Sequence, residues 1–137
     1  MPRLTRRIAI LTLVFASCSL ACLGQALSLA NVRKVYVEPM ENHLDQYLTS
    51  EISRQFHGSL QIVTSAAEAD AVLKGVNLGA QSTNKATVNL VDPTGKIVLW
   101  SGTAADREGK FLDVKHGGLQ AVASHLIHEL HKAMQSR

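Results

Sequence analysis

The first 26 residues constrain the fold of this chain more than any other segment, because they are not expected to take part in it. Arg3, Arg6 and Arg7 open the chain, and a nearly unbroken apolar run over residues 8–23 follows. This is the layout of a bacterial export signal. The run is shorter than the roughly 20 apolar residues that cross a hydrocarbon core, so an uncleaved membrane anchor is the weaker alternative. We therefore expect residues 27–137 to fold outside the cytosol.

The end of this segment allows two kinds of processing. Gly24 and Ala26 place small residues where a signal peptidase requires them, and cleavage there releases a soluble chain that starts at Leu27. Alternatively, the stretches FASC and SLAC resemble a lipobox, in which Cys18 or Cys22 becomes the lipid-bearing first residue. Neither stretch has the usual leucine three residues before the cysteine. The product is periplasmic in the first case and associated with the outer membrane in the second.

Removal of this segment changes both the cysteine content and the charge of the folded part. Cys18 and Cys22 are the only cysteines, so residues 27–137 cannot form a disulfide. The 111 residues that remain of 137 suffice for one domain with an ordinary core. Three of the 14 basic residues leave with the segment, and the other 11 balance 11 acidic residues. A neutral chain lacks the basic surface on which nucleic-acid binding depends, so we expect no nucleic-acid partner.

The remaining chain alternates between strand and helix signals and predicts a single α+β domain. Apolar residues at helical spacing predict helices over residues 41–57 and 119–134. Runs rich in β-branched residues predict a sheet of four to five strands. This sheet is expected to be mixed, because a right-handed crossover makes the first two strands parallel whereas the last two form a hairpin, and both helices are expected on one of its faces. The predicted strands span residues 31–37, 60–63, 71–78, 85–91 and 96–103.

Local signals predict where these elements begin and end. Asn42 is the predicted N-cap of the first helix, and Gly58 is its left-handed stop. Ser65 and Glu68 match a capping box, which predicts one helical turn before the third strand. In the sequence DPTG over residues 92–95, proline at the second position and glycine at the fourth predict a tight turn between the last two strands.

Three histidines near the carboxyl end, His125, His128 and His131, raise the question of a metal site. At 100° per residue the apolar residues of this helix share one arc, with His125 and His131 on its flanks and His128 pointing away. His125 and His128 are helical neighbours that could chelate a metal weakly, whereas all three cannot converge. The sequence HELH has one residue too few for the zinc-protease motif. The helix is therefore interpreted either as a solvated surface or as a metal or small-ligand binding module.

Residue types that form catalytic sites in other proteins are present in this sequence, but not in a catalytic arrangement. The chain contains no G-x-S-x-G nucleophile elbow. Asp92, Asp106, Glu108 and Asp113 are predicted to solvate turns and loops, and Trp100 is interpreted as a packing residue of its strand. We therefore expect no enzymatic activity and no cofactor, and keep a small envelope hydrolase as an alternative.

Two stretches carry a resemblance to known proteins, EADAVLKG over residues 68–75 and VDPTGKIVLWS over residues 91–101. Together with the order of elements, they resemble small envelope proteins of Gram-negative bacteria. The relevant groups are the amino-terminal domain of the TolB translocation protein, the curli-secretion lipoproteins and the lipopolysaccharide-assembly lipoproteins. The resemblance implies a mixed sheet with packed helices, no catalytic residues, and docking on an envelope protein partner. Membrane contact is then confined to a lipid anchor or an uncleaved signal.

Intact-mass measurement of the chain recovered from the envelope of a Gram-negative host tests the export signal. We expect loss of the three leading arginines, because both kinds of processing remove them. The mass also distinguishes a start at Leu27 from a diacylated start at Cys18 or Cys22. A full-length chain that stays in the cytosol would contradict the predicted signal.

Overall fold

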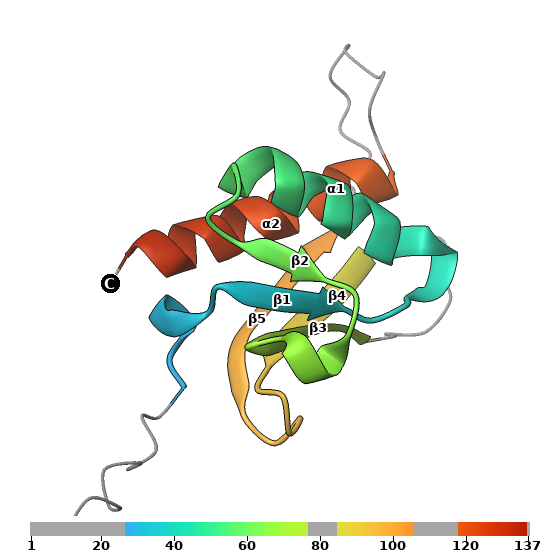
Figure 1. Ribbon diagram of the computed structural model, residues 1–137. Coiled ribbons are helices and arrows are strands. Elements are labelled where there is room, and N and C mark those ends of the chain that lie inside the picture. Colours follow the sequence, from blue (N-terminus) through green and yellow to red (C-terminus); the bar gives the residue numbers. More distant parts are fainter. Residues whose placement is uncertain (1–26, 77–84, 106–117, 137) are drawn as a thin grey trace, which may run out of the picture.

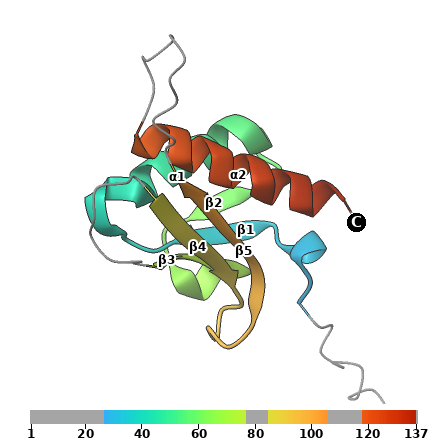
Figure 2. The same cartoon turned by 180° about the vertical axis from the view of Figure 1, so that it is seen from behind.

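The computed structural model describes residues 27–76, 85–105 and 118–136. These residues form two layers, a five-stranded mixed sheet and the helices α1 (Leu44–Phe56) and α2 (Leu119–Gln135), which pack together over it (Figure 1). The view from behind shows the same helix layer above the strands (Figure 2). The predicted α+β class is confirmed. In this part of the chain no helix is long and apolar enough to span a membrane.

The sheet has the strand order β2-β1-β3-β4-β5. β1 (Lys34–Val37) lies between β2 (Gln61–Val63) and β3 (Ala71–Val76) and is parallel to both. β3, β4 (Lys85–Val91) and β5 (Val98–Ala105) are antiparallel neighbours. The parallel first pair and the final hairpin were both predicted. The position of β1 in the middle, which the sequence alone does not predict, leaves β2 and β5 at the two edges.

Alternate strand residues face the helices and form the core. On this face Val35 is paired with Ala71 and Leu73 with Leu90, and all four are buried. Burial of each large apolar side chain is worth about 1.5–3 kcal/mol, which is the main source of stability in a domain without disulfides. The apolar arc predicted for the last helix is confirmed, because its buried residues are Val122, Ala123, Leu126, Ile127 and Leu130.

The start of α1 differs from the prediction. Asn42 is not its N-cap, because Asn42 and His43 both adopt left-handed conformations, with φ of 57° and 59°, in the short 3-10 helix η2 (Glu41–His43). Asparagine tolerates this conformation better than most residues, so the same chemistry that predicted a cap is used for a tight turn. The Met40 amide at this turn donates a hydrogen bond to the Asp45 carboxylate at 3.2 Å, so an aspartate inside the helix fixes the approach of the chain.

The end of α1 is close to the prediction. The chain becomes left-handed at His57, with φ of 48°, and stays so at Gly58, with φ of 86°. The amide and the hydroxyl of Ser59 then donate to the free carbonyl of Phe56, at 2.9 and 2.7 Å. These bonds satisfy a carbonyl that has no partner within the helix.

The first residues of the described chain are tied into the core. They form the 3-10 helix η1 (Leu29–Asn31), so the first strand begins three residues later than predicted, at Lys34. Leu29 and Val32 are buried, and η1 contacts α2. The Asp70 carboxylate accepts a hydrogen bond from the Lys34 amide at 2.8 Å, which holds the start of β1 beside the start of β3.

The helical turn predicted before the third strand is present as the 3-10 helix η3 (Ala66–Glu68). The Ser65 hydroxyl accepts a hydrogen bond from the Ala67 amide at 3.3 Å, which caps this turn. The turn allows β3 to return on the far side of β1 from β2, parallel to β1.

The turn between β4 and β5 is closed by Asp92. As predicted for the DPTG sequence, the Gly95 amide donates to the Asp92 carbonyl at 2.9 Å, and Gly95 has a φ of 73°. The Asp92 carboxylate accepts bonds from the Lys96 and Ile97 amides, both at 2.8 Å, and from the Thr94 hydroxyl. The bonds from Thr94 and Ile97 in particular hold the pKa of Asp92 below its usual value. The prediction that Asp92 solvates the surface is wrong. The residue is buried, and its carboxylate accepts hydrogen bonds from other residues of the same turn.

Trp100 packs against the core along its own strand, as predicted. Its indole lies over Gly102, two residues further on the same face of β5. A Cβ at Gly102 would stand 2.6 Å from indole atom Cζ2, closer than real contacts allow. Gly102 is therefore the residue that lets the ring lie flat on the strand, an arrangement in which an aromatic side chain covers an edge glycine.

The substitution Gly102→Ala should lower the free energy of unfolding by about 1–3 kcal/mol, because the added methyl group displaces the indole. Urea denaturation measures this loss. Adding Trp100→Phe to Gly102→Ala should recover part of it, since the smaller ring leaves room. Ser101→Ala, on the opposite face, serves as the control and should change stability by less than about 0.5 kcal/mol. If Gly102→Ala lowered the free energy of unfolding by the same amount with Trp100 as with Trp100→Phe, the contact between the indole and Gly102 would be contradicted.

Candidate functional site

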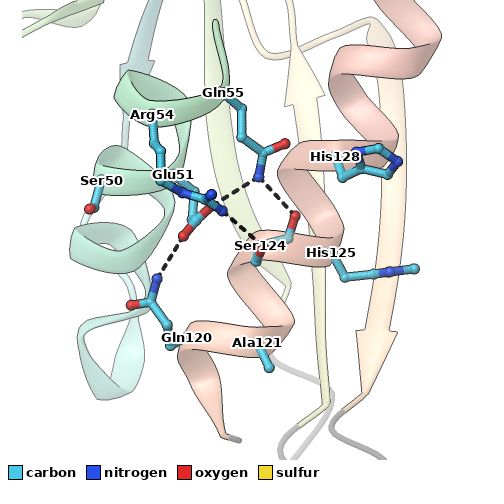
Figure 3. A pocket seen from close by; sticks show the side chains of 9 residues that line it. All are labelled: Ser50, Glu51, Arg54, Gln55, Gln120, Ala121, Ser124, His125 and His128. Carbon is cyan, nitrogen blue, oxygen red and sulfur yellow. Dashed lines mark hydrogen bonds and ion pairs between the residues drawn. The ribbon is translucent and has the colours of Figure 1, made fainter. Parts of the chain in front are cut away.

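Polar side chains from both helices gather along a shallow groove between α1 and α2 (Figure 3). Most of the groove is open to solvent, but one acidic residue in it is buried. Its lining residues are Ser50, Glu51, Arg54 and Gln55 from α1, with Gln120, Ala121, Ser124, His125 and His128 from α2.

Glu51 is the buried acid, with only 3% of its side chain exposed. Arg54 Nη2 donates to Glu51 Oε2 at 2.5 Å, and Gln55 Nε2 donates to the same oxygen at 2.9 Å. Gln120 Nε2 donates to the other oxygen, Oε1, at 2.6 Å. One carboxylate oxygen is thus bound by α1 and the other by α2, so a single acid joins the two helices.

Ser124 extends this network on α2. Arg54 Nη2 donates to the Ser124 hydroxyl at 3.3 Å, and Gln55 Nε2 donates to the Ser124 carbonyl at 3.1 Å. The donors that hold Glu51 are therefore themselves held by α2 (Figure 3).

Burial alone would raise the pKa of Glu51, but the hydrogen bonds from Arg54 and Gln55, the charge of Arg54 and the bond from Gln120 outweigh it. The pKa of Glu51 lies below its usual value of 4.5 as a result. An acid that stays ionised at neutral pH cannot supply a proton as a general acid there. The arrangement is that of a charged link between helices.

The three histidines of α2 have different surroundings. His125 and His128 are exposed and point away from Glu51 (Figure 3). His131 instead packs on Phe56 of α1, with ring centroids 4.6 Å apart, and its Nε2 lies 2.9 Å from Gln135 Nε2. The three rings do not converge, as expected. Within the described ranges no group of three or more histidine, cysteine or acidic residues could hold a metal ion, and a weak site at His125 and His128 stays a prediction.

Sequence reasoning missed Glu51, although a signal for it was present. Glu51 follows Leu48 by three residues, so it falls on the apolar arc that α1 turns toward the core. A charged residue on such an arc needs partners, and Arg54 and Gln55 follow at helical spacing. The third partner, Gln120, lies 69 residues away, so no local pattern identifies it. Five other residues named in the sequence analysis lie outside the described residues: Cys18, Cys22, Asp106, Glu108 and Asp113.

A second candidate site is the outer edge of β5. This strand is last in the sheet order and eight residues long, and its sequence VLWSGTAA contains no charged residue and no proline. Across the described ranges no backbone hydrogen bond joins β5 to any segment beyond β4 and the turn before it. Its hydroxyls face β4, where Thr103 Oγ1 lies 2.7 Å from Thr87 Oγ1 and Ser101 Oγ donates to Asn89 Oδ1 at 2.7 Å.

The opposite edge of the sheet is formed by a much shorter strand. β2 is three residues long and contacts α1. Natural sheets protect their edges with short strands, charges, proline or a covering element, because exposed N–H and C=O groups pair with other strands. β2 is protected by its short length, whereas β5 is long and uncharged. A helix contacts each edge strand, α1 at β2 and α2 at β5, so a covering helix does not distinguish the two edges.

Comparison with known proteins shows similarity only at the level of solved structures. No protein-family model matches the chain, and no curated protein matches it. The chain is similar to the PelC dodecamer from Paraburkholderia phytofirmans, with 21% identity and a TM-score of 0.45 over 77% of this chain and 88% of that one. It is also similar to uncharacterized lipoprotein B from Nitrosomonas europaea, with 18% identity and a TM-score of 0.41 over 79% of each chain. These distant likenesses carry no inference about a ligand or partner.

Replacing the buried acid by Glu51→Gln should lower the free energy of unfolding at pH 7 by about 1–3 kcal/mol, because the guanidinium of Arg54 loses its ionised acceptor. The pKa of Glu51 is depressed in the folded state, so its contribution is fully present above pH 4.5 and is lost as the pH falls through the folded value. The difference between the two proteins should therefore shrink in acid.

Urea denaturation at a series of pH values measures this difference. Glu129→Gln is the matched control, because Glu129 is half-exposed and lies 3.9 Å from Lys132 on the same helix. That variant should differ from the parent by less than about 0.5 kcal/mol at any pH. A pH-independent loss in Glu51→Gln would contradict the ionic link.

Proposed function

We propose that this chain is an exported, non-enzymatic accessory domain of the bacterial envelope, which binds a protein partner by adding a strand of that partner to β5. The outer edge of β5, which pairs with no other strand among the described residues, is the observation that carries this proposal. An edge strand offers a row of main-chain donors and acceptors, and an extended segment of a partner can satisfy them. Affinity then comes from backbone hydrogen bonds, and the partner's alternate side chains supply specificity.

The composition of β5 defines the kind of segment it fits. β5 carries no charge, so a charged partner strand would lose hydration without gaining an ion pair. Small residues follow one another through the second half of the strand, which lets another backbone approach closely. The partner segment is therefore expected to be extended, uncharged and rich in β-branched residues.

The α1–α2 groove is a less suitable surface for binding a partner than the edge of β5. Its buried acid has all its donors within the chain, and its rim is polar and open. A partner that bound there would have to compete with the bonds that hold the helices together. The groove is better explained as part of the fold.

The envelope setting of the proposal rests on residues 1–26 as the export signal, with residues 27–137 as the exported domain. The mature chain is either periplasmic and soluble or held at the outer membrane by a lipid on Cys18 or Cys22. The resemblance to TolB-type, curli-secretion and lipopolysaccharide-assembly proteins supports a docking role. Its second stretch falls on the β4–β5 hairpin and includes the first half of the proposed edge strand, and its first stretch falls mainly on β3, on the other side of β4.

Site-directed photocrosslinking in a Gram-negative host tests the role of β5. A photoreactive residue in place of Ala105, in the full chain, should form one adduct of defined mass with an envelope protein. Ser101→Lys with Thr103→Lys should reduce this adduct about tenfold, because placing two lysines in an uncharged strand pairing costs on the order of 1–2 kcal/mol. Ser53→Lys on exposed α1 is the matched control and should leave the adduct unchanged.

Three outcomes would contradict the proposal. No adduct would show that β5 has no partner. An adduct that survives both lysines would place the partner on another surface. An adduct only with a second copy of this chain would show that the edge serves self-association.

A further inference from the structure

The turn between β4 and β5 carries the most exposed large apolar side chains of the described chain. We call residues 93–98 the hairpin tip. Ile97 is 58% exposed and Val98 is 56% exposed, whereas Tyr47 and Val76, the other exposed large apolar residues, are each at 37%. Two adjacent aliphatic residues on a protruding turn have no role in the core and none in the β4–β5 ladder beyond their backbone.

The charges of the hairpin tip are positive. Lys96 is exposed, and Lys74 Nζ would stand 3.9 Å from a Cβ on Gly95, so a second ammonium group lies beside the turn. Lys74 is also paired with Glu38, at 3.3 Å. The one carboxylate of the turn, Asp92, is bound inward by amides and a hydroxyl and is buried. Aliphatic side chains flanked by lysines are the composition that sits at a membrane interface.

The start of the described chain leaves the molecule toward the same end as the hairpin tip. η1 itself contacts α2, but in Figure 1 and Figure 2 the blue segment that precedes it runs away from the helix layer, toward the side of the molecule on which the turn between β4 and β5 lies. Leu29, which is buried, follows Cys22 by seven residues. Seven residues reach at most about 25 Å, so a lipid on Cys22 would hold this end of the domain close to the bilayer.

We propose that the hairpin tip is a lipid-contacting site, which places Ile97 and Val98 among the headgroups of the membrane that carries the lipidated amino-terminal cysteine. The inference rests on the lipid-anchored form of the proposed function. A diacylated cysteine holds the chain at the bilayer but does not fix the tilt of the domain, and a second weak contact next to it acts at high effective concentration. The tip thereby fixes the orientation of the domain and turns α1 and α2 toward the periplasm.

Photocrosslinking to lipid tests this site. The full chain, purified from the envelope of a Gram-negative host, is placed in vesicles of phosphatidylethanolamine and phosphatidylglycerol. A photoreactive residue at Ile97 should give at least about tenfold more phospholipid adduct than one at Tyr47, an exposed apolar position on α1, because only the tip reaches the headgroup region. Mass spectrometry counts the adducts.

A charge at the tip provides the second measurement. Val98→Asp should reduce the lipid adduct at position 97 severalfold, because a carboxylate resists entry into an anionic interface. Ser53→Asp on α1 is its control and should leave the adduct unchanged. Both side chains are exposed, so thermal unfolding should show the same transition for the variants and the parent.

Several results would overturn the lipid site. Equal lipid adducts at positions 97 and 47 would show no oriented contact, and a protein adduct at position 97 would show that the tip binds protein. A mature chain that starts at Leu27 would remove the anchor and with it this inference. Each of these leaves the crosslink from position 105 unaffected, so the lipid site can fail while the role of β5 stands.

Discussion

The pairing of β1 with a parallel strand on each side is the constraint on which the rest of this structure depends. Parallel neighbours cannot be joined by a tight hairpin, so α1 and the η3 turn provide the two connections. The early part of the chain therefore forms the parallel part of the sheet, whose edge is the three-residue strand β2. The antiparallel half then extends away from it and ends at β5, which is eight residues long. The placement of one central strand thus determines which edge remains available.

The second organising feature is the ionised carboxylate between the helices. Each Glu51 oxygen is held by a different helix, so a shift of α2 along α1 by one turn would separate Glu51 from Gln120. A buried charge that loses its partners costs several kcal/mol. Apolar packing brings the two helices together, and this network selects one register among those that apolar packing alone would allow.

Local periodicity predicted the elements well, because a buried stripe repeats every three or four residues whatever covers it. Leu126, Ile127 and Leu130 were recognised in this way, and so was the DPTG turn. Features that depend on distant partners were not. The position of β1, the inward bonds of Asp92 and the link from Glu51 to Gln120 join residues that no local pattern relates. Asn42 was misplaced because asparagine suits both a cap and a left-handed turn. The position of β5 at an edge of the described sheet could not be recognised before the strand order was known.

The contact between η1 and α2 joins the beginning of the domain to its end. η1, which contains the buried Leu29, packs against the 17-residue helix α2, and α2 also contacts β4, β5 and α1. The core of the described residues is therefore incomplete until α2 has formed. Contacts between such distant segments form slowly. If the chain is exported as proposed, this late completion of the core leaves it unfolded enough to pass through a membrane channel.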